Sequence, residues 1–247
     1  MLAGGAIGAE AYAQLRDSLQ SLLESAHKLF ANGIAQPVAQ AIDLDLGEGL
    51  RLTGVVDRAF KGVDDHLLLF DAQPTRAAGL KEMLSFYIDW AALRLTRADT
   101  VQADFLEPTY NRKGAQTSKL LALLQAQDTD QLRRGLRRLI EAYLAAEQQP
   151  LLFFPRTAQT YALNDLETRL GKAATAWEGD DFNGGERDYA PGYAALLSRG
   201  LELFDPHSPA HRSFVAATEL VCEVLDPQHT MLLKPSVSEP ATAGEKA

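Results

Sequence analysis

The fold of this chain is decided by residues 38–71, which read VAQAIDLDLGEGLRLTGVVDRAFKGVDDHLLLFD. Apolar and polar residues alternate along residues 38–46 and again along residues 50–60, and the turn Gly47-Glu48-Gly49 separates the two runs. Such alternation is typical of half-buried strands joined by a tight turn. A second turn near residues 62–65 leads into the apolar run 66–71. The stretch therefore predicts three successive strands of an antiparallel meander.

Helical periodicity surrounds the predicted meander. Residues 12–30 place apolar side chains at helical spacing, and Asn32-Gly33 is a stop signal. A second helix is predicted over residues 76–97, and it is apolar on two sides, which indicates burial on two sides and a surface made for a partner. A short strand is predicted at residues 101–106. Further helices are predicted at residues 117–127, 129–148, 161–177, 191–203 and 209–225, with another strand at 151–154 and a loop rich in Gly and Asp at 178–189.

This order of elements predicts an α/β fold, with a mixed sheet and flanking helices. We expect an α/β core over residues 1–150 and a mostly helical extension of the same domain over residues 151–233. Residues 234–247 are polar and contain proline, which predicts a disordered tail.

Composition excludes several classes of protein. Apolar residues make up 46% of the 247 residues and charged residues 23%, as in soluble globular proteins. No apolar run is long enough for a membrane span. Residues 1–8 contain no basic residue and too short an apolar core, so we expect no signal peptide there. The single cysteine, Cys222, excludes an internal disulfide framework and fits a reducing, cytoplasmic setting.

The charge of the chain is unevenly distributed. The formal net charge is −9, which argues against a general nucleic-acid coat. Residues 112–138 nevertheless hold seven basic residues against two acidic ones, a net charge of +5. Four arginines in this stretch follow i, i+1, i+4, i+5 spacing along one predicted helix: Arg133, Arg134, Arg137 and Arg138. This spacing indicates either a solvated face, with partial pairing to Glu141, or a face that contacts DNA phosphates or another subunit.

Two acidic residues lie on neighbouring predicted strands. Asp57 follows Gly54-Val55-Val56, and Asp71 ends the run Leu67-Leu68-Leu69-Phe70. Carboxylates on adjacent strands can converge on one divalent cation, and a metal-held water can hydrolyse a phosphodiester. The plainer interpretation of Asp57 is an ion pair with Arg58 or Arg51.

The pattern G-x-x-D-R on one strand, followed by an acid on the next strand and then an amphipathic helix, resembles the core of the RecB-family nucleases of the PD-(D/E)xK fold. The resemblance implies a nuclease-like α/β fold in which two acids bind magnesium and a lysine serves the attacking water. Here Gln73 stands in the position of the lysine, and residues 5–10 lack the family's histidine. A neutral amide supplies neither positive charge nor a titratable amine. We therefore expect no catalytic residue, and only vestigial positions at Asp57, Asp71 and Gln73.

Three further segments resemble the C-terminal region of the RecC family, the gamma subunits of exodeoxyribonuclease V, over residues 2–233. They are the glycine-rich opening 3–8, the passage 138–155 and the acidic loop 177–181 before Tyr189. The resemblance implies a non-catalytic nuclease-fold domain with structural and DNA-handling roles in double-strand break repair and recombination. Its implied partners are RecB-type and RecD-type subunits and duplex or split DNA ends. Magnesium and ATP would be used by those subunits, with no cofactor or metal in this chain, which has no P-loop motif.

Two alternatives from other classes stay open. Lys81 begins the helix after Asp71, and a lysine that has migrated there could complete an active magnesium-dependent DNA exonuclease with Asp57 and Asp71. Against this, a lysine early in a helix usually keeps its ammonium in water. The second alternative is a protein-interaction module with no DNA contact.

Overall fold

The computed structural model describes residues 5–30, 36–61, 66–74, 76–97, 101–109, 115–180, 182–197 and 202–233. The chain divides into two compact units, Met1–Pro150 and Leu151–Ala247, which are described separately. No helix in these described ranges is long and apolar enough to cross a lipid bilayer. The predicted stop Asn32-Gly33, the predicted turn 62–65 and the predicted tail 234–247 lie outside the described residues.

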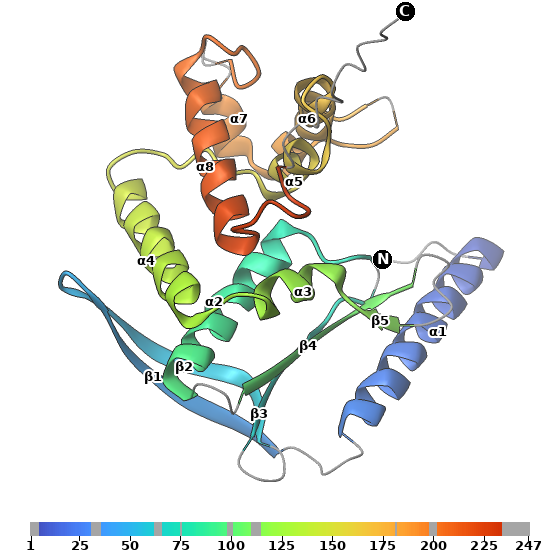
Figure 1. Cartoon of the computed structure of the whole chain (residues 1–247). Coiled ribbons are helices and arrows are strands. Elements are labelled where there is room, and N and C mark those ends of the chain that lie inside the picture. Colours follow the sequence, from blue (N-terminus) through green and yellow to red (C-terminus); the bar gives the residue numbers. More distant parts are fainter. Residues whose placement is uncertain are drawn as a thin grey trace, which may run out of the picture. The chain divides into compact units, whose positions relative to one another are not determined.

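The first unit is built on a five-stranded mixed sheet in the order β1-β2-β3-β4-β5 (Figure 1). Strands β1, β2 and β3 pair antiparallel, which confirms the predicted meander. Strand β4 then joins β3 in parallel, and β5 pairs antiparallel with β4. The strands are β1 (Gln36–Gly47), β2 (Leu50–Lys61), β3 (Leu67–Ala72), β4 (Val101–Pro108) and β5 (Ala115–Thr117).

The long β1–β2 hairpin is closed by the two-residue turn Glu48-Gly49. Gly47 pairs with Leu50, and both turn residues have positive φ, 51° at Glu48 and 80° at Gly49. Positive φ at both central residues is the geometry of a type I′ turn, whose twist matches that of the flanking strands. Gly49 adopts this conformation readily because it has no Cβ.

Among the described residues, four helices complete the first unit. Helix α2 covers one face of the sheet, with α3 and α4 packed against α2, while α1 lies on the other side of β4 and β5 (Figure 1). Helix α4 starts with a capping box, in which Asp128 accepts from the Gln131 backbone N–H at 2.8 Å. The helices are α1 (Gly5–Phe30), α2 (Leu80–Arg97), α3 (Lys119–Gln125) and α4 (Thr129–Ala146).

Helix α2 is buried on two sides within the first unit. Towards the sheet, the Phe86 ring packs edge-to-face on Phe105 of β4, with ring centroids 5.3 Å apart. On another side, the Trp90 indole N–H donates to the carbonyl oxygen of Leu124 in α3 at 3.3 Å. The two-sided apolar pattern is thus explained by packing inside this unit, and it no longer indicates a partner-binding surface.

The second unit is an assembly of helices around aromatic side chains. The Phe154 ring lies against Trp177 at 4.3 Å, Tyr193 at 5.3 Å and Phe214 at 6.5 Å between centroids. Helix α8 begins at the predicted residue, because Ser208 accepts from the Ala210 N–H at 3.1 Å. The elements are α5 (Pro155–Leu163), α6 (Arg169–Glu178), the 3-10 helix η3 (Glu186–Tyr189), α7 (Pro191–Leu197) and α8 (Pro209–Leu225).

Three expectations for the chain need correction. The predicted strand 151–154 is irregular backbone, and its last residue, Phe154, is the N-cap of α5 and buries its ring. The predicted helix 161–177 is two helices, α5 and α6, separated by Asn164 and the residues that follow it. Of the predicted helix 191–203, Pro191–Leu197 forms α7, residues 198–201 lie outside the described residues, and residues 202 and 203 are not helical. The three-residue strand β5 was not predicted, because so short a segment has no readable alternation.

Candidate functional site

Strand β2 is interrupted by a β-bulge at the residues of interest. Val56 pairs with Gln40 and Ala59 with Val38, so Asp57 and Arg58 together oppose the single residue 39 of β1. A bulge of this kind breaks the strict alternation of a strand and redirects side chains. As a result, Asp57 is exposed while Arg58 is only partly exposed.

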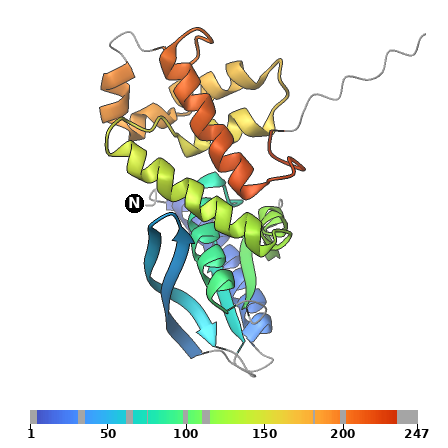
Figure 2. The same ribbon diagram turned by 60° about the vertical axis from the view of Figure 1, so that its left-hand side comes forward.

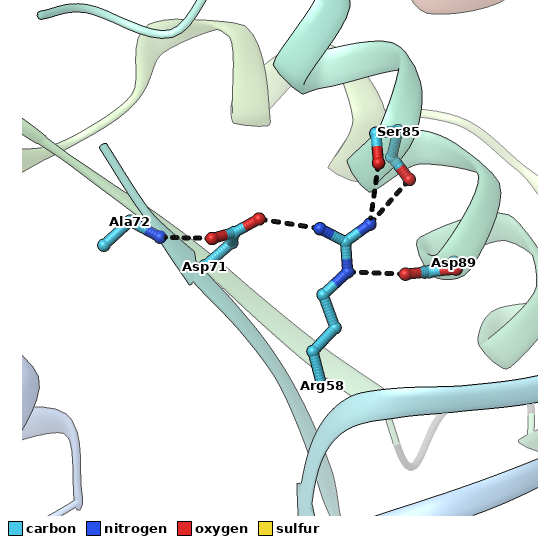
Figure 3. Close-up of polar contacts among 5 residues, drawn as sticks. All are labelled: Arg58, Asp71, Ala72, Ser85 and Asp89. Carbon is cyan, nitrogen blue, oxygen red and sulfur yellow. Dashed lines mark hydrogen bonds and ion pairs between the residues drawn. The ribbon is translucent and has the colours of Figure 1, made fainter.

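The Arg58 side chain bridges two carboxylates that come from different elements (Figure 3). Its Nη1 donates to Oδ2 of Asp71, on β3, at 2.6 Å. Its Nε donates to Oδ2 of Asp89, on α2, at 2.5 Å. One guanidinium therefore ties strand β2 to strand β3 and to the helix that covers the sheet.

The remaining contacts complete the bridge. Arg58 Nη2 donates to the backbone oxygen of Ser85 at 2.8 Å and to its hydroxyl at 3.1 Å. Asp71 Oδ1 accepts the N–H of Ala72 at 2.8 Å, so both carboxylate oxygens are bonded. The Arg58 side chain is only 27% exposed. Charge-assisted bonds at partly buried groups are stronger than surface ion pairs, because water screens them less.

In this arrangement the positive charge of Arg58 neutralises the negative charge of Asp71. Divalent cations such as magnesium take carboxylate oxygens as ligands. Here the Oδ2 oxygen of Asp71 is directed at a guanidinium, and a second cation beside Arg58 would be repelled by it. The Arg58 guanidinium therefore competes with a metal ion for this carboxylate.

Asp57 does not join this bridge. The plain expectation of an ion pair with Arg58 or Arg51 is not met, because Arg51 donates to Asp43 instead, at 2.6 Å from both Nε and Nη2. Asp57 lies exposed in the bulge. Within the described ranges, no group of three or more His, Cys, Asp or Glu side chains is arranged to hold a metal ion.

Gln73 and Lys81 lie at either end of the connection from β3 to α2. The backbone N–H of Gln73 donates to the Leu106 oxygen at 2.8 Å and so extends the pairing of β3 with β4. Lys81 is exposed in the first turn of α2. It stands four residues before Ser85 and eight before Asp89, so it shares the helix face that carries the partners of Arg58.

The four arginines predicted as one stripe on α4 divide into two pairs. Arg133 Nη1 donates to the backbone oxygen of Asp45 at 2.6 Å, which anchors α4 to the β1–β2 hairpin (Figure 2). Arg137 donates to the carboxylate of Glu48 at the hairpin turn and, at 2.8 Å, to Glu141. The hydrogen bond from Arg137 lowers the pKa of Glu48 and keeps it ionised.

The other pair points to solvent. Arg134 and Arg138 are exposed on α4. Two arginines of α4 therefore lie at its exposed surface, where an anion can approach them, while Arg133 and Arg137 hold the hairpin. The spacing of the arginines did not predict this division, because the hairpin partners of Arg133 and Arg137 lie 88 and 89 residues away in sequence.

Comparison with protein families adds one decisive result. The model of the RecC C-terminal domain family matches residues 1–166. The chain belongs to this family. No curated protein matches the chain.

The matched part of this RecC-type domain contains the whole sheet, the Arg58 bridge and helix α4. The acidic loop 177–181, which also resembles the family, lies outside the matched residues. The recognition made from sequence is confirmed, and so is the α/β fold class with its mixed sheet.

Sequence reasoning on the RecC-type domain missed Ser85 and Asp89. Both are polar residues in the middle of a helix that buries much of its length, and they are spaced i, i+4 and therefore lie on one face. That pairing was a readable signal, since a polar face on a buried helix needs a partner. Which strand supplies the partner was not readable, because it depends on the bulge in β2.

Proposed function

We propose that the chain is a non-catalytic, nuclease-fold domain of a RecC-type subunit of a RecBCD helicase–nuclease. Its roles are structural and DNA-handling, in double-strand break repair and recombination. The partners in this proposal are RecB-type and RecD-type subunits and duplex or split DNA ends. Those subunits use ATP and magnesium, and the complex works in the cytoplasm.

The observation that carries the proposal is the bridge from Arg58 to Asp71 and Asp89. Magnesium binding at Asp71 would require Arg58 to give up charge-assisted hydrogen bonds, each worth about 1.5–3 kcal/mol. It would also leave the guanidinium partly buried without its partners, which is costly. The bonds that hold Asp71 to Arg58 therefore support a non-catalytic site.

Gln73 supports the same conclusion. In the nucleases that the sequence pattern around Asp57 and Asp71 resembles, a lysine occupies the position where Gln73 stands. An amide can accept and donate hydrogen bonds, but it does not supply positive charge near a developing phosphate charge.

Lys81 supports the alternative, an active magnesium-dependent exonuclease that uses Asp57, Asp71 and Lys81. It lies on the α2 face that carries Ser85 and Asp89, which is the observation in its favour. For this function Arg58 would have to swing away from Asp71 and Asp57 would have to turn inward. Both rearrangements oppose the contacts that hold β2 to α2.

The DNA-handling role is assigned to the exposed arginines of α4. The chain is acidic overall, with a formal net charge of −9, so attraction to a polyanion has to come from a local cluster. Arg134 and Arg138 are exposed on α4 and make this cluster accessible. The guanidinium groups of Arg133 and Arg137 are bonded to the hairpin.

Assembly with purified RecB-type and RecD-type subunits tests the proposal. We expect the chain, within its complete RecC-type subunit, to form a complex that degrades linear DNA in the presence of ATP. Asp71→Asn keeps an oxygen that can accept from Arg58, so we expect the complex to retain its full degradation rate. Asp43→Asn, in the exposed pair with Arg51, is the matched control.

Two outcomes would contradict the proposal. A specific loss of degradation in the Asp71→Asn complex would place a working active site in this domain. Failure of the subunit to assemble with either partner would contradict the structural role.

A further inference from the structure

The loop between α6 and η3 presents an aromatic side chain to solvent. Phe182 is 94% exposed, the largest exposure among the described large hydrophobic residues. Tyr189, at the other end of the loop, is 82% exposed. Single exposed apolar residues are common on proteins, so exposure alone carries little information. The hydrogen bonds and glycines of this loop distinguish Phe182 from other exposed apolar residues.

Hydrogen bonds to Asp180 hold the backbone N–H groups of Phe182 and of the residue after it. The Asp180 carboxylate oxygen Oδ1 accepts the N–H of Phe182 at 2.9 Å and the N–H of Asn183 at 2.7 Å. The Asp180 N–H donates to the Asn183 oxygen at 2.9 Å. These N–H bonds also hold the pKa of Asp180 below its usual value, so the carboxylate stays ionised and keeps accepting. Asp180 therefore holds both Phe182 and Asn183.

Two glycines bring the base of the loop together. Gly179 has a φ of +88°, and a Cβ there would come within 2.6 Å of the Asn183 oxygen. A Cβ at Gly185 would come within 2.1 Å of the Trp177 oxygen. Only glycine permits so close a passage of the two backbones. Gly179 and Gly184 form an isolated β-bridge across it.

The loop is also fastened to the first turn of α5. The Glu186 carboxylate accepts the N–H of Arg156 at 3.1 Å and the N–H of Thr157 at 2.7 Å. The Arg156 side chain donates back to the Gly184 oxygen at 3.1 Å. Glu186 thus caps a helix N-terminus, where a negative charge is favourable. The loop and the helix hold each other in place.

Rigid presentation of an aromatic side chain favours binding. A phenylalanine has only two side-chain torsions, and the backbone N–H of Phe182 is already bonded, so the residue loses little conformational entropy when a partner covers it. Aromatic anchors in desolvated pockets dominate the energetics of protein interfaces. In the chain by itself the Phe182 side chain is exposed to water, so it adds little packing to the fold.

The charge of the loop restricts the partner. Residues 178–189 contain five acidic residues against one arginine, a net charge of −4. This charge repels nucleic-acid phosphates, and it favours a surface rich in lysine and arginine.

We propose that Phe182 inserts into an apolar pocket rimmed by lysine and arginine side chains on another protein subunit of the complex. The inference rests on the proposed function, because it requires the chain to assemble with partner subunits. The proposed function names no residue that contacts a partner subunit, whereas this inference names Phe182.

Binding of the full RecC-type subunit to RecB-type and RecD-type subunits, measured by biolayer interferometry, tests this contact. Phe182→Ser should weaken binding to one of them at least about 10-fold, as expected for an interface anchor. Leu166→Ser is the matched control, because Leu166 is an apolar residue of the same unit, 60% exposed and outside the loop. The control should bind with unchanged affinity. Higher salt should weaken wild-type binding, because the pocket rim is cationic.

A photoreactive p-benzoylphenylalanine at position 182 identifies what covers the side chain. We expect a cross-link to a protein segment containing lysine or arginine beside apolar residues. A cross-link to DNA or to a second copy of this chain would overturn the inference. Equal affinity of Phe182→Ser and wild type would also overturn it, while leaving the proposed assembly intact. Absence of any wild-type binding would instead contradict the proposed function on which the inference rests.

Discussion

The guanidinium Nη1 of Arg58 lies 2.6 Å from the carboxylate oxygen Oδ2 of Asp71. This contact joins two adjacent strands at the position where the related nuclease fold is expected to hold magnesium. The same side chain reaches Asp89 on the covering helix at 2.5 Å. A position that could serve metal chemistry is thus used, in this chain, to hold the sheet and the helix together.

Replacement of Arg58 should destabilise the first unit. Arg58→Met removes the positive charge and leaves Asp71 and Asp89 without a cation between them. We therefore expect the free energy of unfolding to fall by about 2–3 kcal/mol. Urea unfolding followed by Trp90 fluorescence, in a Trp177→Phe background, measures it. Arg51→Met is the control from the same strand, because its ion pair with Asp43 is exposed. That change should cost about 0.5 kcal/mol or less. Equal losses in the two variants would contradict a special role for Arg58.

The exposed arginines of α4 should govern contact with DNA. Arg134→Ala with Arg138→Ala should weaken binding about equally for all DNA sequences. Each lost phosphate contact should also flatten the slope of log affinity against log salt by about one unit. Fluorescence anisotropy of the assembled complex over a salt series measures both effects. The double variant Arg16→Ala with Lys28→Ala removes the same charge from exposed positions of α1 and should leave the slope unchanged. An unchanged slope in the α4 variant would assign that face to another role.

The inner arginines of α4 should control the hairpin. Arg133→Ala with Arg137→Ala removes the bonds to the Asp45 oxygen and to Glu48. We expect faster hydrogen exchange at the tip of the β1–β2 hairpin, with little change in β3 and β4. Exchange followed by mass spectrometry resolves these segments. Unchanged protection of the tip would show that apolar packing alone holds the hairpin.

Asp226, at the end of α8, should make the second unit sensitive to acid. Burial raises the pKa of this carboxyl, but the N–H groups of Leu232, Met231 and Thr230 outweigh burial and lower it. Because the folded-state pKa is depressed, the carboxylate stabilises the unit above about pH 4, and this stabilisation is lost as the pH falls through the folded pKa. Asp226→Asn places an amide against those N–H groups and should cost about 2 kcal/mol at pH 7.

Urea unfolding of Asp226→Asn at several pH values tests this. The difference in the free energy of unfolding between wild type and Asp226→Asn should shrink towards pH 3. Glu219→Gln, at an exposed position of α8, should match wild type throughout. A difference that does not change with pH would mean that the ionised state of Asp226 contributes nothing.

Local patterns in the sequence were sufficient to predict much of the fold. The alternation around Gly47-Glu48-Gly49 predicted the hairpin, because the side-chain period and the turn geometry are both local properties. Helix α8 began where Ser208 and Pro209 indicated. The strand predicted at residues 151–154 was wrong, since a short apolar run can equally lead into a buried helix start.

The site could be predicted only in part. Asp57 and Asp71 were singled out because they end or interrupt apolar strands, and of the two only Asp71 bonds to Arg58. That Arg58 would pair with Asp71 and Asp89 could not be read, because a one-residue bulge decides which way side chains point. The same limit applies to Arg133 and Arg137, whose hairpin partners are far away in sequence.

The most direct test of the silent-site account is DNA cleavage by the purified chain with magnesium. Linear duplex DNA would be incubated with wild type and with Asp71→Asn, and the products resolved on a gel. We predict no cleavage above the level of buffer alone in either sample, because Arg58 holds the Asp71 carboxylate. Magnesium-dependent cleavage by wild type that disappears in Asp71→Asn would contradict the account.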